Sequence, residues 1–420
     1  MNLRHTLNRH KNLMESFISL SIINAVNMFL PFISLPYMLR IIGPANYGIY
    51  SYVFTLIQYL ILITSYGFMF SATKQVSQNR DDNISLNNIF TSVFFSRCIL
   101  LIGSLIVFAI LAPLLLDTPE KLKMFWWGTG MVIGEILMPT YLYQGLEKMR
   151  FLAIVNIIPK VIFTILIFIV IKQPQDYQYI IILNSLGYII AGICSMSIAY
   201  HQFGVKISRP CIEHIKFQLK EGFSIFASTM GMNLYRNSNI LILGLLCNDS
   251  VVGIYAAAEK IIKALQSVTL PLIQSLFPHM SLQLKDKPLK EAATTILKIS
   301  AKMFYILILF SAIAYLLSPL MSDIILGKDF QAAIPLIRIM TLVVLLGGIN
   351  YTLGIIGLIN LNKGKQFFHY VVISGVTSIL VLLIFANRYT YYAAAWAMVI
   401  AELISCILCY TTLKKQKSMS

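Results

Sequence analysis

Nine ionisable side chains lie inside long apolar stretches of this 420-residue sequence. Six are basic and three are acidic: Arg97, Lys160, Arg236, Lys260, Lys263 and Arg338, against Glu135, Glu259 and Glu402. A charged group at the centre of a membrane span costs roughly 2.5 to 3.5 kcal/mol, so most of these groups must face protein or a wet cavity. A surplus of fixed positive charge there favours an anionic ligand, with phosphate as the matching chemistry.

Four of the bases are expected to form a cationic substrate-binding cavity: Arg236, Lys160, Lys260 and Lys263. Arg236 lies near the middle of its apolar run and cannot lose its charge. Neither Arg236 nor Lys160 has an acid within one turn of its own helix, which favours a functional role. The polar residues expected to line the same cavity are Asn24, Asn27, Asn233 and Asn237.

The remaining charges have structural alternatives. Glu259 and Lys263 are four residues apart and can pair on one helix face, which would leave Lys260 to face a cavity or another partner. Ion coupling is a candidate role for the three acids, Glu135, Glu259 and Glu402. Glu135 and Glu402 can equally be partners of the bases.

Arg97 and Arg338 lie near the ends of their apolar runs. A long basic side chain in such a position extends towards the membrane interface. We therefore expect both side chains to reach the interface.

The elements that position these residues are predicted to be membrane-spanning helices. Charged residues make up only 12% of the sequence and mean hydropathy is +0.76, whereas soluble domains carry about 25% charged residues. A helix needs about 20 mostly apolar residues to cross the bilayer. Twelve runs qualify: 16–39, 47–72, 89–113, 124–145, 151–172, 178–200, 218–246, 251–277, 292–318, 332–361, 366–387 and 391–413.

Charge and aromatic residues predict the orientation of these spans. With both termini in the cytoplasm, the inward segments hold 21 of the 33 basic residues and eight acids. The outward loops hold six of each, so the net charge of +16 follows the positive-inside rule and requires no nucleic acid. An aromatic belt falls at the predicted outer ends: Trp126, Trp127, Tyr177, Tyr179, Tyr389, Tyr391 and Tyr392.

No cofactor, metal or catalytic site is predicted. The six cysteines are scattered and imply no disulfide framework. The glycines from Gly128 to Gly134 have the wrong spacing for a dinucleotide loop, and we expect them to allow close helix packing. Because no Walker loop is present either, transport would be driven by an ion gradient or by the gradient of the substrate.

The chain also contains one pattern twice. Gly48-Ile49-Tyr50 recurs 205 residues later as Gly253-Ile254-Tyr255, each copy following a long apolar run and a short polar break. Repeated halves in an apolar chain are typical of secondary transporters. This pattern predicts two lobes of six helices, 1–205 and 206–420.

Three segments resemble bacterial polysaccharide-unit flippases of the Wzx type. The segment from Pro36 to Gly48 is similar to the link between the first two helices of that family. The segment from Gln144 to Met149, preceded by Pro139, resembles its loop between the fourth and fifth helices, and Gly253 to Lys260 resembles its eighth helix. Tyr141 departs from the family, which often has Trp there.

This resemblance implies membership of the multidrug/oligosaccharidyl-lipid/polysaccharide exporter superfamily. The expected fold is all-α, with two pseudo-symmetric six-helix lobes around a central cavity. The expected passenger is an oligosaccharide repeat unit on undecaprenyl pyrophosphate, moved across the bacterial inner membrane by alternating access. Polymerase and chain-length proteins of the same pathway are its implied partners.

Two other functions remain open from the sequence. A multidrug exporter would share the fold, but cationic drugs usually call for an acidic cavity. A membrane glycan polymerase or ligase would need a catalytic constellation on a sizeable outer loop, and the predicted outer loops are all short.

Overall fold

The structure is a computed structural model that describes residues 3–284 and 287–418. Within that part, the side chains of residues 3–25, 27–28, 31, 232, 234–236, 270–275 and 278–279 are not described. Three predicted site residues, Arg236, Asn24 and Asn27, therefore lie outside the described side chains.

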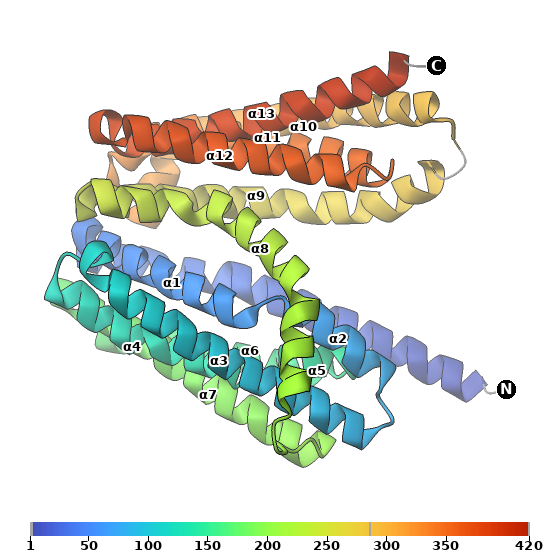
Figure 1. The fold of residues 1–420 in the computed structure, drawn as a ribbon. Coiled ribbons are helices and arrows are strands. Elements are labelled where there is room, and N and C mark those ends of the chain that lie inside the picture. The colour runs from blue at the N-terminus through green and yellow to red at the C-terminus, as the bar shows by residue number, and fades with distance from the viewer. Residues whose placement is uncertain (1–2, 285–286, 419–420) are drawn as a thin grey trace. The chain divides into compact units, whose positions relative to one another are not determined.

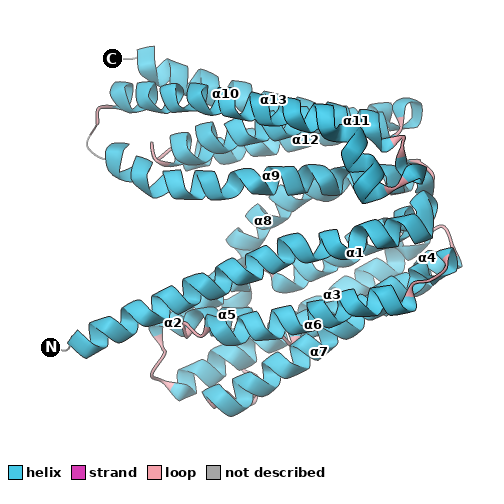
Figure 2. Ribbon diagram, turned by 180° about the vertical axis from the view of Figure 1, so that it is seen from behind, coloured by secondary structure: helices cyan, strands magenta, loops and turns pink. Residues whose placement is uncertain are grey.

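Helices make up almost all of the described chain, and residues 3–284 and 287–418 contain no strand (Figure 2). Contacts divide it into two compact units. The first unit comprises residues 1–42 and 52–230, and the second comprises residues 43–51 and 231–420. The lobe boundary at 205/206 stays a prediction.

Figure 1 labels the helices in chain order. Those before residue 204 are α1 (Leu3–Ser65), α2 (Phe68–Gln78), α3 (Asn83–Leu115), α4 (Pro119–Ile136), α5 (Thr140–Gly145), α6 (Met149–Val170) and α7 (Tyr177–Phe203). The later ones are α8 (Ile212–Leu246), α9 (Asp249–Leu284), α10 (Leu289–Met321), α11 (Ala333–Asn350), α12 (Gly364–Tyr389) and α13 (Tyr391–Ser418). Short 3₁₀ or π segments are η1 (Pro174–Asp176), η2 (Ser322–Leu326), η3 (Lys328–Phe330) and η4 (Tyr351–Ile359).

In the first unit, α7 packs against both α4 and α6, and α2 packs against α5. The α4–α7 contact depends on glycine: a Cβ on Gly134 would lie 2.3 Å from the backbone of Tyr188, and one on Gly192 would lie 2.4 Å from the Gly134 carbonyl oxygen. The expectation of close packing at Gly134 is confirmed. This contact sets Glu135 beside α7.

Two predicted spans are interrupted in this unit. The run 47–72 breaks at Tyr66 and Gly67, which both adopt positive φ, 44° and 80°. The run 124–145 breaks between Ile136 and Thr140, before the short helix α5. Pro139 lies in this second break, and proline lacks the N–H that a continuous helix would need.

In the second unit, α11 packs against α9, α10 and α13, and α12 packs along α13. Its core gathers apolar side chains from α9, α10, η4 and α13, including Met280, Ile296, Ile356 and Leu413. The helix begun by α11 continues as η4, a nine-residue π-helix. Segments of this kind are often found at functional sites.

Eight helical stretches among the described residues are long and apolar enough to span a membrane. The first of them, Phe32–Gln78, contains two breaks. Gly43 lies in the predicted link between the runs 16–39 and 47–72, whereas Tyr66 and Gly67 lie inside the second of these runs. Large apolar side chains are exposed along these helices, including Ile110, Leu316 and Ile384. Such exposure suits a protein solvated by lipid. The count of twelve spans stays a prediction.

Candidate functional site

A cavity of about 260 Å³ lies within the first unit. Its lining combines two charged groups, Glu135 of α4 and Lys160 of α6, with neutral polar groups from Asn156, Asn184 and Tyr188. Apolar and other side chains complete the wall: Val26, Leu30, Met138, Pro159, Phe163, Thr164, Gly187 and Ala191. The cavity therefore brings together an ammonium, a carboxylate and amides.

Lys160 is placed by the second half of α6. Pro159 precedes it and removes one backbone donor from the helix. Thr164 donates from Oγ1 to the Lys160 carbonyl oxygen at 2.9 Å. Asn156, one turn earlier, donates to the Leu152 carbonyl oxygen at 3.1 Å, so its amide oxygen stays available to a bound molecule.

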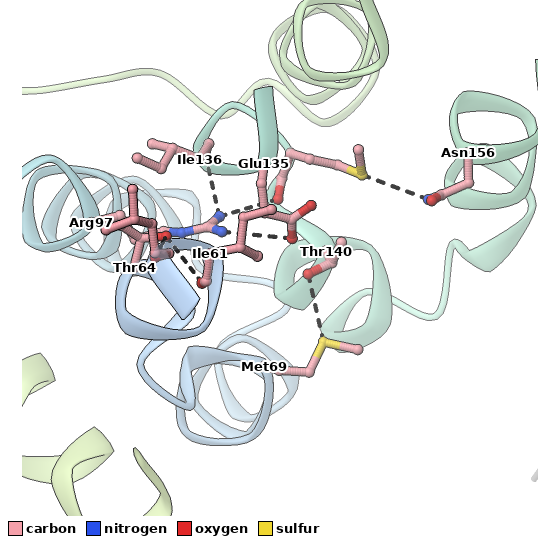
Figure 3. A network of polar contacts seen from close by, with 10 residues as sticks. Ile61, Thr64, Met69, Arg97, Glu135, Ile136, Thr140 and Asn156 are labelled. Atoms are coloured by element: carbon pink, nitrogen blue, oxygen red, sulfur yellow. Dashed lines mark hydrogen bonds and ion pairs between the residues drawn. The ribbon is translucent and has the colours of Figure 1, made fainter. Parts of the chain in front are cut away.

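Glu135 forms an ion pair with Arg97 of α3 (Figure 3). The Arg97 guanidinium lies 3.7 Å from the Glu135 carboxylate. It also donates to the carbonyl oxygens of Ile136 and Met138, at 3.3 Å each. The Ile136 carbonyl is at the C-terminal end of α4, where helical partners are missing. The Met138 carbonyl lies in the link that follows and also accepts from the Thr140 N–H at 2.9 Å.

The expectation that Arg97 reaches the membrane interface is wrong. Its side chain is buried, with 5% exposed, against α4. Sequence separation hid this role, because the groups it binds lie about 40 residues further along the chain. Arg338 is only partly buried: Nε donates to Ser318 Oγ at 3.1 Å, and the guanidinium lies 5.2 Å from the Tyr315 ring centre.

A second polar cluster lies within the second unit, between α8 and α9. Glu259 and Lys263 form the ion pair that their spacing predicts, at 2.9 Å. Lys263 also donates to Asn237 Oδ1 at 3.2 Å, and Asn237 donates to Asn233 Oδ1 at 3.2 Å. Two predicted cavity asparagines and one predicted substrate lysine thus belong to one hydrogen-bonded chain.

Burial differs within this cluster. Glu259 is buried, with 3% exposed, while Lys260 on the next position is exposed. The hydroxyl of Tyr255 lies 3.5 Å from the Glu259 carboxylate and accepts from Asn239 Nδ2 at 2.8 Å. Lys263 is therefore committed to internal contacts, whereas Lys260 is presented to a bound molecule or to solvent.

Glu402 of α13 lies in a third place, with α11 and α9. Asn350 Nδ2 donates to the Glu402 carboxylate and also to its backbone carbonyl oxygen, at 2.9 Å. The Gln266 amide lies near the same carboxylate: a Cβ on Gly347 would be 2.9 Å from Gln266 Nε2 and 3.7 Å from the Glu402 carboxyl. Asn350 and Gln266 were missed from the sequence, since neither has an informative local pattern.

The predicted site residues thus form three groups. Glu135 and Lys160 share the cavity of the first unit. Glu259, Lys263, Asn237 and Asn233 share the chain of contacts in the second. Glu402 lies in its own cluster with Asn350. The described residues contain no group of three or more His, Cys, Asp or Glu side chains placed to hold a metal ion.

Comparison with known proteins identifies relatives of this chain. Two bacterial proteins named "Putative O-antigen transporter" are similar over nearly their whole length. The one from Escherichia coli (strain K12) is 25% identical over 396 residues, covering 93% of this chain and 94% of the relative. The one from Shigella dysenteriae is 27% identical over 397 residues, covering 94% and 97%.

Solved structures show the fold. The lipid II flippase MurJ, in an inward closed conformation, matches with a TM-score of 0.77 and 15% identity over 94% of this chain and 87% of that one. An inward-facing multidrug resistance transporter of the MATE family, in the MOP superfamily, matches with a TM-score of 0.74 and 13% identity over 96% and 99%. The fold is that of an all-α multi-pass membrane transporter.

The family is shown by a sequence model that covers well over half of the chain. Residues 13–283 match the model described as polysaccharide biosynthesis protein. That range includes the whole cavity of the first unit and the cluster around Glu259. This chain therefore belongs to the polysaccharide biosynthesis protein family.

Proposed function

We propose that this protein is a flippase of the bacterial inner membrane. Its passenger would be an oligosaccharide repeat unit on undecaprenyl pyrophosphate, moved from the cytoplasmic to the periplasmic leaflet for O-antigen, capsule or exopolysaccharide synthesis. The observation that carries this proposal is the similarity to two proteins named as O-antigen transporters over more than nine-tenths of every chain compared. The fold shared with a lipid II flippase supports it.

The chemistry of the first-unit cavity suits such a passenger. Sugar hydroxyls are bound by amides and carboxylates, which Asn156, Asn184 and Glu135 supply. A phosphate oxygen would be bound by the Lys160 ammonium. In the second unit, exposed Lys260 would add a second phosphate-binding cation, and Arg236 is proposed to act with it.

Alternating access would move the passenger between leaflets. We propose that the two six-helix lobes rock about a central cavity, and that an ion gradient drives the movement. Glu135, Glu259 and Glu402 are the candidate coupling groups. Each carboxylate lies beside an ion-pair or hydrogen-bond partner that a bound proton or cation would displace or reorient.

Complementation of a flippase-null strain tests the cationic site. Lys160→Met should reduce surface polysaccharide at least tenfold at equal protein level, since a charge-assisted contact contributes roughly 1.5–3 kcal/mol. Lys160→Arg should retain part of the activity. Lys298→Met, on the exposed part of α10, is the matched control and should complement fully. Full restoration by Lys160→Met would remove Lys160 from the site.

Leaflet location of the lipid-linked unit separates this function from a polymerase or ligase. A null strain should accumulate single repeat units on the cytoplasmic leaflet. If single units instead reach the periplasmic leaflet, the protein acts after translocation and the flippase proposal fails. Two results together would instead indicate a multidrug exporter. The strain that contains the protein would export cationic drugs, and the null strain would make normal polysaccharide.

A further inference from the structure

A groove of about 430 Å³ runs between α12 and α13 on the surface of the second unit. Val381, Phe385 and Tyr389 line it from α12 at intervals of four residues. From α13 the lining residues are Tyr392, Ala393, Trp396 and Ile400. Since residues four apart share one face of a helix, the groove follows the two helix axes.

The groove is open rather than filled. Three of its four aromatic side chains, Phe385, Tyr389 and Trp396, are 45%, 48% and 47% exposed. In a membrane-spanning helix pair, such a face is covered by lipid chains. The lining from Val381 to Tyr389 rises roughly 12 Å along α12 at 1.5 Å per residue. That length is below half of the hydrocarbon core, which is about 30 Å thick.

One end of the groove carries a cation. Arg388, in the last turn of α12, is exposed, and its guanidinium lies 5.5 Å from the centre of the Tyr389 ring. Among the residues that the structure describes, it makes no ion pair. The turn that follows is tight: Thr390 adopts φ 47°, and the rings of Tyr391 and Tyr392 lie 4.8 Å apart.

An apolar groove that fits within one leaflet, ended by a guanidinium beside aromatic rings, matches a phospholipid. The chain would lie along Phe385 and Trp396, and the phosphate would accept paired hydrogen bonds from Arg388. A 55-carbon polyprenyl chain is far longer than the groove, so its fit to one leaflet is poorer. We infer that α12 and α13 form a binding site for an anionic phospholipid, independent of the passenger proposed above.

Tryptophan quenching tests this site directly. The chain has three tryptophans, so replacing Trp126 and Trp127 by Phe leaves Trp396 as the only reporter. Brominated phosphatidylglycerol should quench Trp396 at about fivefold lower mole fraction than brominated phosphatidylcholine, the preference expected of one basic residue at a lipid surface. Equal quenching by the two lipids would overturn the inference.

Variants assign the preference to Arg388. Arg388→Gln in the single-tryptophan protein should abolish the headgroup preference, while Arg209→Gln, an exposed arginine in the loop after α7, should leave it unchanged. A preference that survives Arg388→Gln contradicts the site. If unbrominated undecaprenyl phosphate relieves quenching at lower mole fraction than phosphatidylglycerol, the occupant is a polyprenyl lipid and the phospholipid assignment is wrong.

Native mass spectrometry provides a second readout that needs no tryptophan replacement. The otherwise unaltered chain should retain a bound phosphatidylglycerol that Arg388→Gln loses. Phe385→Ala should lose it as well, because the aromatic wall is removed. Retention by both variants would overturn the proposal.

Discussion

Gly48 and Gly253, the first residues of the two Gly-Ile-Tyr copies, pack directly against each other. A Cβ on Gly48 would lie 1.8 Å from the Asp249 carbonyl oxygen, and one on Gly253 would lie 1.9 Å from the Pro44 carbonyl oxygen. Each would also be 2.9 Å from the backbone nitrogen of the other glycine. The contact is therefore reciprocal: the same offset of 205 residues relates both partners, as across a local two-fold axis.

Alanine at either glycine is expected to destabilise the protein. The added methyl group would overlap backbone rather than a movable side chain, so Gly48→Ala and Gly253→Ala should each lower the free energy of unfolding by about 1–3 kcal/mol. Thermal unfolding in detergent measures this. Gly103→Ala is the control, since nothing lies within 4 Å of its Cβ position in α3. Unfolding of all three variants at one temperature would contradict the close contact.

Removing the buried Arg97 should leave the partly buried Glu135 carboxylate without the cation that pairs with it. Arg97→Met is expected to cost about 3–5 kcal/mol in the free energy of unfolding, as for other broken buried pairs. Glu135→Gln in the same protein should recover part of that loss. The Arg80–Glu147 pair is the comparison: at 2.7 Å it is shorter, but its side chains are 36% and 32% exposed. Arg80→Met should therefore cost about 0–1 kcal/mol.

Two lysines of α9, Lys260 and Lys263, are expected to have separate effects on stability and transport. Lys263→Gln removes the partner of buried Glu259 and a donor to Asn237, so it should lower the unfolding temperature. Lys260→Gln should leave that temperature nearly unchanged, because the side chain is exposed. If Lys260 binds the passenger as proposed, its substitution should still reduce surface polysaccharide. Equal effects of both variants on unfolding would argue against this division.

Acid should weaken one surface ion pair at the start of α4. The Lys121 ammonium lies 2.8 Å from the Asp117 carboxylate, and this hydrogen bond, aided by the charge, lowers the pKa of Asp117 below its ordinary value. A lowered pKa contributes stability that is present above the unfolded value of about 3.9 and is lost as pH falls through the folded value. Asp117→Asn should thus be less stable than the native protein at pH 7 and equal to it in strong acid.

The size of this effect is limited by solvent. Asp117 is 70% exposed, although Lys121 is only 3% exposed. We expect a difference of about 0–1 kcal/mol at pH 7 that shrinks in high salt. Chemical unfolding between pH 7 and pH 3 measures this difference in the free energy of unfolding. Asp176→Asn, which replaces an aspartate of η1 just before α7, is measured beside it for comparison. A difference that persists below the folded pKa would point to a cause other than charge.

The sequence was sufficient for what depends on local spacing. The Glu259–Lys263 pair follows from a separation of four on one helix, and the close packing at Gly134 follows from glycines in an apolar run. Helical class and membrane residence follow from composition and run length. None of these inferences needs a contact between distant residues.

Contacts between helices that are distant in the chain could not be predicted from the sequence. The burial of Arg97 depends on the Ile136 and Met138 carbonyl groups at the break after α4, and the grouping of Glu402 with Asn350 and Gln266 depends on how α9, α11 and α13 pack. The same applies to the π-helix that follows Asn350, since its residues carry no pattern that distinguishes it from an α-helix. Tertiary packing decides each of these features.

Gly43 interrupts α1, and glycine is needed there for its backbone conformation rather than for lack of space for a side chain. Its backbone adopts φ 72° and ψ 175°, a region open almost only to glycine, yet nothing lies within 4 Å of the position where a Cβ would stand. The mirror image of this conformation is ordinary extended backbone for an L-residue. A D-alanine introduced there by chemical synthesis would therefore suit the backbone without strain, whereas the right-handed helix at Gly48 would disfavour it.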